Sequence, residues 1–308
     1  MKAFYSASIL ARDESKSREL EKAMAELQSI EDSLPYAQHK TVRRRIPVGV
    51  YNVIADFGQA RGANTATILP NNPDHARKYG RAILMRYNIM TNDSIFANRK
   101  RRYDAVIDAG YRDHLTREGG FNRTLWHEVG HYLGVSKTAD SRKLGAALAD
   151  HANLFEEMKS DLVSLYAAPK LRAIAYHDDD GLRAHYADGI RRTLQNVKPR
   201  PQQAYQNMQL MQFNYYMESG LLEANPATGL LRINYDRYHE VVTDLLREVL
   251  SIQFSGDYEF ADAFVKRWNY WDETLHGGLA ERINNSGSYR RTLVRYRALA
   301  EDPALLLR

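Results

Sequence analysis

The stretch His127-Glu128-Val129-Gly130-His131 says most about this chain, because it can place two metal ligands on one face of a helix. Histidines four residues apart on a helix lie one above the other, with their Cβ atoms roughly 5–6 Å apart. Both imidazoles can then reach one tetrahedral zinc ion, while Glu128 lies beside the open coordination position as a candidate general base. The alternative is a surface helix that carries two histidines by chance.

The residues around this stretch predict a helix. Asn122 is a suitable N-cap, and Gly134 suits the position just beyond a helix C-terminus. Between them lies an apolar stripe made of Leu125, Trp126, Val129 and Leu133. This stripe would hold the helix against the core and present its polar side chains on the other faces.

A third ligand is what distinguishes a catalytic zinc site from a coincidence, since such a site usually has three protein ligands and one position for water. Downstream, Asn153 and Glu156 have the spacing of a capping box, which predicts a helix from Asn153 to about Ala167. We expect Pro169 to prevent its continuation, because proline lacks the backbone N–H that a helix needs. Glu156 points to a separate face and is interpreted as a cap.

Glu157 and Asp161 share a polar stripe on this second helix. The carboxylate of Glu157 can ligate the metal. Asp161, one turn further on, can accept the second ring N–H of a ligating histidine and so determine its tautomer. The alternative for both residues is an acidic, solvated helix start, which also suits the helix macrodipole.

The two motifs, 127–131 and Glu156-Glu157-Met158-Lys159-Ser160-Asp161, resemble those of the dipeptidyl peptidase III family of zinc peptidases and its bacterial relatives. That family pairs a His-Glu zinc motif with a downstream Glu-Glu-x-x-x-Glu/Asp motif. The resemblance implies one Zn²⁺ per chain, held by His127, His131 and Glu157. It also implies Glu128 as the base and Asp161 behind the histidines. Many members have the longer H-E-x-x-G-H form, whereas this chain has the five-residue form.

Other segments resemble the same family. They are Lys2 to Tyr36, Val48 to Ile54, Gly62 to Asn71, and Arg232 to Tyr258. The family holds the substrate backbone with two asparagines, of which Asn71 matches the second, while Ile68 replaces the first. His239 falls within a residue of a substrate-binding histidine, although an ordinary surface histidine on a helix is the alternative. We expect His239 or a tyrosine to stabilise the oxyanion.

Known relatives carry a long lobe upstream of the point that corresponds to Met1 here. The sequence is therefore expected to be a fragment, a naturally short form, or a chain whose cleft is completed by a partner chain or oligomer. The three alternatives stay open at this point.

Composition sets the remaining bounds. Hydrophobic residues make up 44% and charged residues 26%, as in soluble globular proteins, and no run of 18 apolar residues predicts a membrane span. The absence of cysteine excludes disulfides and thiolate chemistry, and we expect a cytoplasmic protein. Residues 1–11 resemble a signal peptide only faintly, and their alternation fits a half-buried strand as well.

The formal net charge of +5 raises the question of whether the chain binds nucleic acid. The basic clusters at 43–45, 100–102 and 290–291 are short and mixed with acids elsewhere, and no binding motif surrounds them. A solvated surface is the better interpretation, and no nucleic-acid partner is expected.

The pattern of elements predicts a mainly α (α+β) fold, a helical zincin-like catalytic domain with a small β flank near the N-terminus. A strand at the start, a helix over 15–32 and strands over 45–57 and 65–69 form the α/β flank, residues 1–75. Residues 76–308 are mostly helical, and 1–308 is expected to form a single catalytic unit.

These observations predict a zinc metallopeptidase that hydrolyses short peptides with a zinc-activated water and Glu128 as base. Its substrates would be short peptides, and the resemblance suggests release of N-terminal dipeptides. The alternative is a non-catalytic module, in which zinc stabilises the chain and the groove binds a peptide or partner. Glu128 favours the enzyme, because a structural zinc site normally has four protein ligands and no use for an unligated carboxylate.

Overall fold

The computed structural model describes residues 7–42, 46–57, 65–69, 78 and 82–287. These residues group into two compact units, the first within 7–25 and 46–98 and the second within 26–42 and 99–287. The assignment of 1–308 to a single catalytic unit stays a prediction beside this division.

The first unit is built on a mixed four-stranded sheet, in the order β1-β2-β4-β3. Its strands are β1 (Ala7–Arg12), β2 (Val48–Phe57), β3 (Ala66–Leu69) and β4 (Ala82–Arg86). β2 and β4 are parallel, and the two outer pairs are antiparallel. Helix α1 (Glu14–Met24) packs against β2 through the buried side chains of Leu20 and Met24. The sheet thus extends beyond residue 75, since β4 alternates buried and half-buried side chains as a strand with one covered face does.

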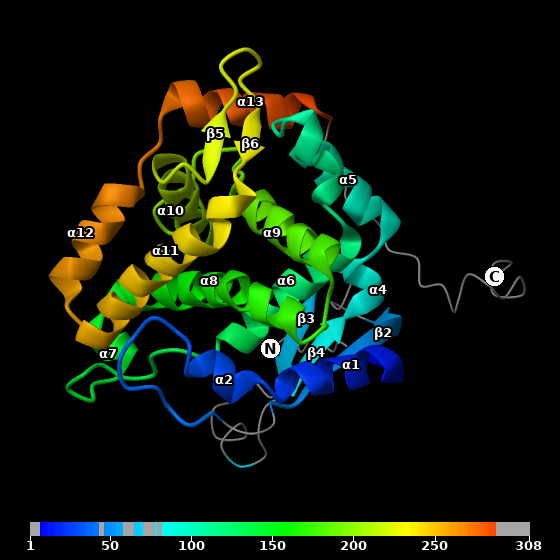
Figure 1. Cartoon of the computed structure of the whole chain (residues 1–308), viewed down its shortest axis with the longest axis vertical. Coiled ribbons are helices and arrows are strands. Elements are labelled where there is room, and N and C mark those ends of the chain that lie inside the picture. The colour runs from blue at the N-terminus through cyan, green and yellow to red at the C-terminus, as the bar shows by residue number, and fades with distance from the viewer. Residues whose placement is uncertain (1–6, 43–45, 58–64, 70–77, 79–81, 288–308) are drawn as a thin grey trace, which may run out of the picture. The chain divides into compact units, whose positions relative to one another are not determined.

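The second unit is helical (Figure 1). Its longer helices are α6 (Arg117–Gly130), α8 (Ala152–Ala173), α9 (Asp179–Thr193), α10 (Ala204–Glu218), α11 (Tyr235–Ser255) and α12 (Tyr258–Trp268). Shorter helical segments are α2 (Leu27–Glu31), η1 (Ala109–His114), α7 (Leu144–Ala147), η2 (Ala149–His151), η3 (Glu273–Gly277) and α13 (Gly278–Asn285). A two-stranded ribbon joins β5 (Leu222–Ala224) to β6 (Leu231–Ile233). Helix α4 (Tyr87–Met90) belongs to the first unit. Helix α5 (Asp93–Asp104) contains the boundary, since its residues up to Asn98 are grouped with the first unit and those from Arg99 with the second. The expected mainly helical fold with a small sheet near the N-terminus is confirmed.

Helix α8 is the centre of this unit and packs against α6, α9, α10 and α11 (Figure 1). Its buried side chains lie on all sides, as expected of a helix surrounded by others. They are both apolar and polar: Phe155, Met158, Leu162 and Leu165 lie beside Glu157, Lys159 and Asp161. Polar groups at such depth need partners, and those partners come from the surrounding helices.

Three helix boundaries differ from the sequence expectation. α8 continues through Pro169 to Ala173, because the buried Ala168 and Leu171 keep its last turns packed in the core. Burial of these side chains outweighs the lost hydrogen bond that normally ends a helix at proline. The predicted helix over 15–32 is divided into α1 and α2, and the helix that carries residues 127–131 begins at Arg117, before the expected N-cap Asn122.

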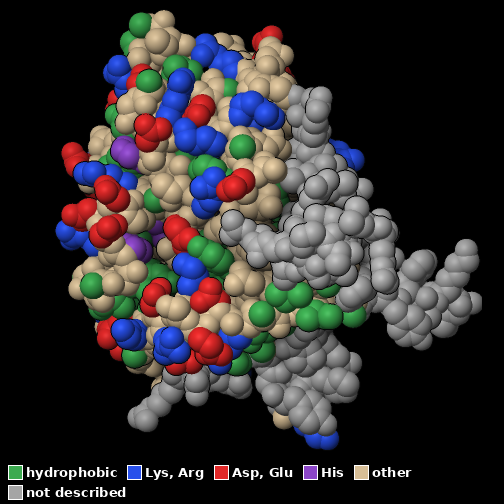
Figure 2. All heavy atoms as spheres, turned by 90° about the vertical axis from the view of Figure 1, so that its right-hand side faces the viewer, with side chains coloured by type: hydrophobic (Ala, Val, Ile, Leu, Met, Phe, Trp, Pro, Cys, Tyr) green, Lys and Arg blue, Asp and Glu red, His purple; other side chains and the backbone are tan. Residues whose placement is uncertain are grey.

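Surface charge is mixed on the face in Figure 2, where Lys and Arg side chains are interspersed with Asp and Glu. Among the described residues, no helix is both long and apolar enough to cross a membrane.

Candidate metal centre

Helix α6 carries the His-Glu motif and begins earlier than the sequence suggested. Thr116 is its N-cap, and the hydroxyl of Thr116 accepts a hydrogen bond from the backbone N–H of Gly119. Asn122 lies inside the helix. The helix ends at Gly130, with His131 in right-handed helical conformation as the C-cap. The four-residue spacing of the two histidines therefore keeps its helical geometry.

Gly130 lets α6 approach α8 closely. A Cβ atom at this position would lie 2.8 Å from the carbonyl oxygen of Ser160 and 3.1 Å from its Cα. Both contacts are with backbone, so no side-chain rotation could relieve them. A glycine between the two histidines is thus what brings the end of α6 against the turn of α8 that carries Glu157.

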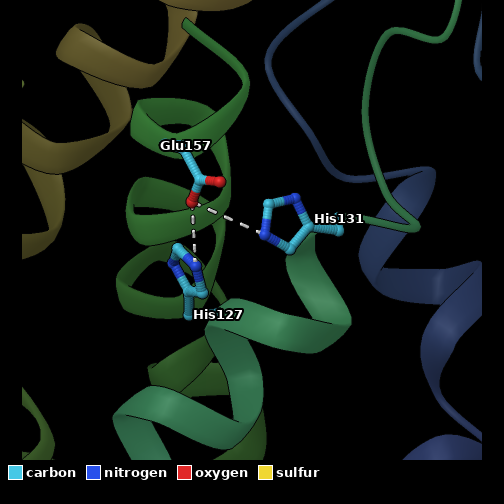
Figure 3. Close-up of side chains that lie close together, drawn as sticks. All are labelled: His127, His131 and Glu157. Carbon is cyan, nitrogen blue, oxygen red and sulfur yellow. Dashed lines mark ion pairs between the residues drawn. The ribbon is translucent and has the colours of Figure 1, made fainter. Parts of the chain in front are cut away.

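The side chains of His127, His131 and Glu157 converge on one point (Figure 3). Oε2 of Glu157 lies 3.3 Å from Nε2 of His127 and 3.7 Å from Nε2 of His131. Bonds of about 2.0–2.1 Å place the ligands of a tetrahedral zinc ion about 3.3 Å apart. The two separations from Oε2 of Glu157 therefore lie near the value that one zinc ion requires, and all three predicted ligand atoms lie within 4.8 Å of one another.

The hydrogen bonding of this group also fits a cation. Oε2 of Glu157 is buried and has no hydrogen-bond partner among the described residues. The two Nδ1 atoms face carboxylates, so their protons belong there and both Nε2 atoms present lone pairs. Three lone-pair atoms that face one another in a buried place repel unless a cation lies between them. The donor set, two imidazoles and a carboxylate, is that of zinc sites with an open position.

His127 is held from behind by Asp161. Oδ1 of Asp161 lies 2.6 Å from Nδ1 of His127, and Arg123 donates to the same oxygen. Burial alone would raise the pKa of Asp161, but Arg123, Arg192 and His127 hold it well below its usual value. Although burial opposes it, Asp161 in turn raises the pKa of His127, which makes this imidazole a stronger base and a better ligand.

His131 has its own acidic partner, Glu156, and not Asp161. Nδ1 of His131 lies 3.0 Å from Oε1 of Glu156 and 2.9 Å from Oγ of Ser160. Burial opposes ionisation of Glu156, but Lys159 and His131 lower its pKa to about 2. The interpretation of Glu156 as a helix cap is wrong, because α8 begins at Ala152 with no side-chain cap.

Lys159 contacts both the end of α6 and the carboxylate of Glu156. Its buried ammonium group donates to the carbonyl oxygens of Gly130 and Leu133, at 2.8 and 2.9 Å, and pairs with Glu156 at 2.8 Å. It thereby satisfies carbonyls that the end of α6 leaves without partners. A cation in this place also suits the negative end of the helix dipole.

Tyr205 on α10 holds the third residue of the group, and sequence reasoning missed it. Its hydroxyl donates to Oε1 of Glu157 at 2.7 Å, which leaves Oε2 facing the histidines. Burial opposes ionisation of Glu157, yet the nearby His127 and the hydrogen bond from Tyr205 lower its pKa. No spacing in the sequence links positions 157 and 205, so only the packing of α10 on α8 could reveal the contact.

The remaining candidates have different positions. Glu128 is half-buried and makes no hydrogen bond or ion pair within the described part of the chain. His239 is exposed on α11, with its ring 5.3 Å from that of Tyr166. Tyr166 follows Glu157 by nine residues on α8, about 13 Å along the helix axis. The structure therefore does not bring His239 into the group, and its oxyanion role stays a prediction. Asn71 lies outside the described residues.

Comparisons with known proteins place this geometry in a family context. No protein-family model matches the chain, and no curated protein matches its sequence. Two solved structures match over 91% of the chain. DPP III from Caldithrix abyssi matches with a TM-score of 0.82 and 25% sequence identity. Dipeptidyl-peptidase III from Corallococcus sp. strain EGB matches with a TM-score of 0.78 and 24% sequence identity. The match covers 54% and 53% of those proteins. The chain is thus a structural relative of the dipeptidyl peptidase III family that spans about half the length of these two members.

Proposed function

We propose that this chain is a zinc-dependent metallopeptidase that hydrolyses short peptides. The observation that carries the proposal is the convergence of His127, His131 and Glu157, each with a further polar side chain beside the atom that points away from the common centre. Such outer partners orient ligands for a metal and tune their basicity. Glu128, next to His127 in the sequence, makes no hydrogen bond or ion pair with the described residues, and its carboxylate would serve as the base that hydrolysis needs.

The chemistry follows from the positions of these groups. Zinc held by the three residues would polarise the scissile carbonyl and lower the pKa of a water molecule. Glu128 would take a proton from the attacking water and later deliver it to the leaving amine. Tyr205 would hold Oε1 of Glu157 away from the open coordination position, which water and substrate would use.

The substrate class rests on the fold shared with the dipeptidyl peptidase III structures. We infer that the substrates are short peptides and that the products include N-terminal dipeptides. Asn71 and His239 remain the proposed substrate contacts.

The decisive experiment compares the wild type with Glu128→Gln on a mixed library of short peptides, with products identified by mass spectrometry. Because Glu128 is not a ligand, the variant should keep its zinc and its free energy of unfolding. It should nevertheless lose nearly all hydrolysis, at least about a hundredfold, since no base remains beside the water. Equal cleavage by the two proteins would refute the assigned role of Glu128.

A zinc-stabilised module that binds peptides or a partner chain is the second candidate, because the chain spans about half of the solved relatives. In the same experiment, a wild type that binds zinc fully and cleaves nothing would favour this module. Products shortened by two residues at the N-terminus would favour the dipeptidyl peptidase, and scattered internal cuts an oligopeptidase.

A further inference from the structure

A second candidate site lies in the helical unit. It is a cavity of about 230 Å³ lined by residues of α5, α9, α10 and α13. Figure 1 shows where these four helices lie. Its polar lining consists of four arginines, a tyrosine and four amides: Arg99, Arg102, Arg191, Arg192, Tyr103, Gln195, Asn196, Gln206 and Gln209. Among the described residues, no carboxylate lines this arginine cavity.

Positive charge exceeds negative charge around the arginine cavity. Two buried carboxylates, those of Asp161 and Asp188, interact with the guanidinium groups of Arg99, Arg123, Arg191 and Arg192. Asp188 binds Arg191 through both oxygens, at 2.5 and 3.2 Å, and lies 3.3 Å from Nε of Arg123. Asp161 is shared by Arg123, Arg192 and His127. With Arg102, five guanidinium groups lie in or beside the lining against these two carboxylates, so positive charge is in excess here.

The lining of the arginine cavity supplies hydrogen-bond donors as well as charge. Four guanidinium groups and four side-chain amides line it. A neutral ligand could accept hydrogen bonds from these groups, but only an anion would also balance the charge.

The arginines of this cavity repel one another. Burial and the charge of Arg191 lower the pKa of Arg99 to about 10, and burial and the charge of Arg123 do the same to Arg192. Guanidinium groups that repel one another at a partly buried surface gain from an anion held between them.

We propose that the arginine cavity is a binding site for a tetrahedral, doubly charged oxyanion, namely phosphate or the phosphoryl group of a small metabolite. Planar guanidinium groups offer paired N–H donors that match phosphate oxygens, and the amides add neutral donors around them. The excess of positive charge suits a dianion better than the single charge of a carboxylate. None of the lining residues is a proposed zinc ligand, but Arg192 also contacts Asp161, so zinc content must be measured beside phosphate binding.

The test is calorimetric titration of the full chain with inorganic phosphate, with acetate and chloride at equal ionic strength as comparisons, and with glycerol 3-phosphate as a phosphoryl ester. Phosphate should bind and the other two anions should not. Tighter binding of the ester would identify a metabolite phosphoryl group as the ligand, and tighter binding of phosphate would identify the free ion.

Two variants locate the binding. Arg99→Gln and Arg102→Gln should each weaken phosphate binding at least about tenfold, because each removes a guanidinium group from the lining. Arg183→Gln is the matched control, because Arg183 lies exposed on α9 in an ion pair with Asp180 and should leave the affinity unchanged. Zinc content measured in parallel should be equal in all four proteins, so that a failure here is distinct from a failure of the metal site. Equal binding of phosphate, acetate and chloride, or wild-type phosphate affinity in both cavity variants, would overturn the proposal.

Discussion

Oδ1 of Asp161 lies 2.6 Å from Nδ1 of His127, and this contact places the Nε2 lone pair of the imidazole opposite Glu157. The carboxylate is itself fixed by Arg123, so the ring has little freedom to rotate. His131 receives the same support from Glu156, and Glu157 from Tyr205. A metal that enters this group meets ligands already oriented, which lowers the entropy cost of binding.

The ligand assignment predicts metal content. The wild type should hold about one zinc per chain by elemental analysis, and His127→Ala, His131→Ala or Glu157→Ala should each remove most of it, because each deletes one of three ligands. Glu240→Ala is the control, since Glu240 is an exposed glutamate on α11. Full zinc occupancy in Glu157→Ala would mean that Glu157 is not a ligand.

The outer partners predict a smaller effect. Asp161→Asn and Glu156→Gln should each weaken zinc affinity about 10–100-fold, measured by competition with a chelator, because the ligating rings lose their orientation. Tyr205→Phe should lie at the lower end, since it removes a single neutral donor. If Glu156→Gln has wild-type affinity while Asp161→Asn does not, then the contact between Glu156 and His131 does not orient the ligand.

Gly130 predicts a packing effect on the metal site. In Gly130→Ala the new methyl group would meet the backbone of Ser160, so α6 and α8 must separate. We expect a loss of about 1–3 kcal/mol in the free energy of unfolding, measured in urea, together with weaker zinc binding. Gly145→Ala is the control: it also lies in a helix, but its Cβ would have no neighbour within 4 Å. Equal stability of the two variants would show that the approach at Gly130 is not tight.

His185 predicts acid sensitivity of the helical unit. It is fully buried beside Ser164, and burial together with the charges of His177 and Arg123 lowers its pKa to about 3. A histidine whose pKa is depressed on folding stabilises the fold above the unfolded pKa, about 6.5, and this stability is lost as the pH falls toward 3. The loss is at most about 1.4 kcal/mol per pH unit.

The measurement is urea unfolding of the wild type and His185→Gln at several values between pH 7 and pH 4. The glutamine stays neutral, so the free energy of unfolding of the variant should fall less steeply with acid. Both proteins share the same metal ligands and carboxylates, so the difference in slope reports His185. Parallel slopes would contradict a buried neutral histidine.

The local patterns of the chain determined much of this site. Positions 127 and 131 share one helical face wherever the helix begins, so the misplaced N-cap at Asn122 did not disturb the pairing of the histidines. Glu157 and Asp161 are likewise one turn apart on α8. The mainly helical fold and the strands β2 and β3 also follow from periodicity, which is a property of neighbouring residues.

Tertiary packing decided what no spacing contains. Whether α8 ends before Pro169 depends on the core that buries Leu171, and the partner of His131 depends on how α6 crosses α8 at Gly130. Tyr205 reaches Glu157 only because α10 packs on α8. Periodicity orients side chains around one helix axis, whereas the choice of partner across helices comes from close packing and from the need of buried polar groups for hydrogen bonds. By itself, therefore, the sequence determined which residues could bind a metal, and the fold decided which side chains hold them in place.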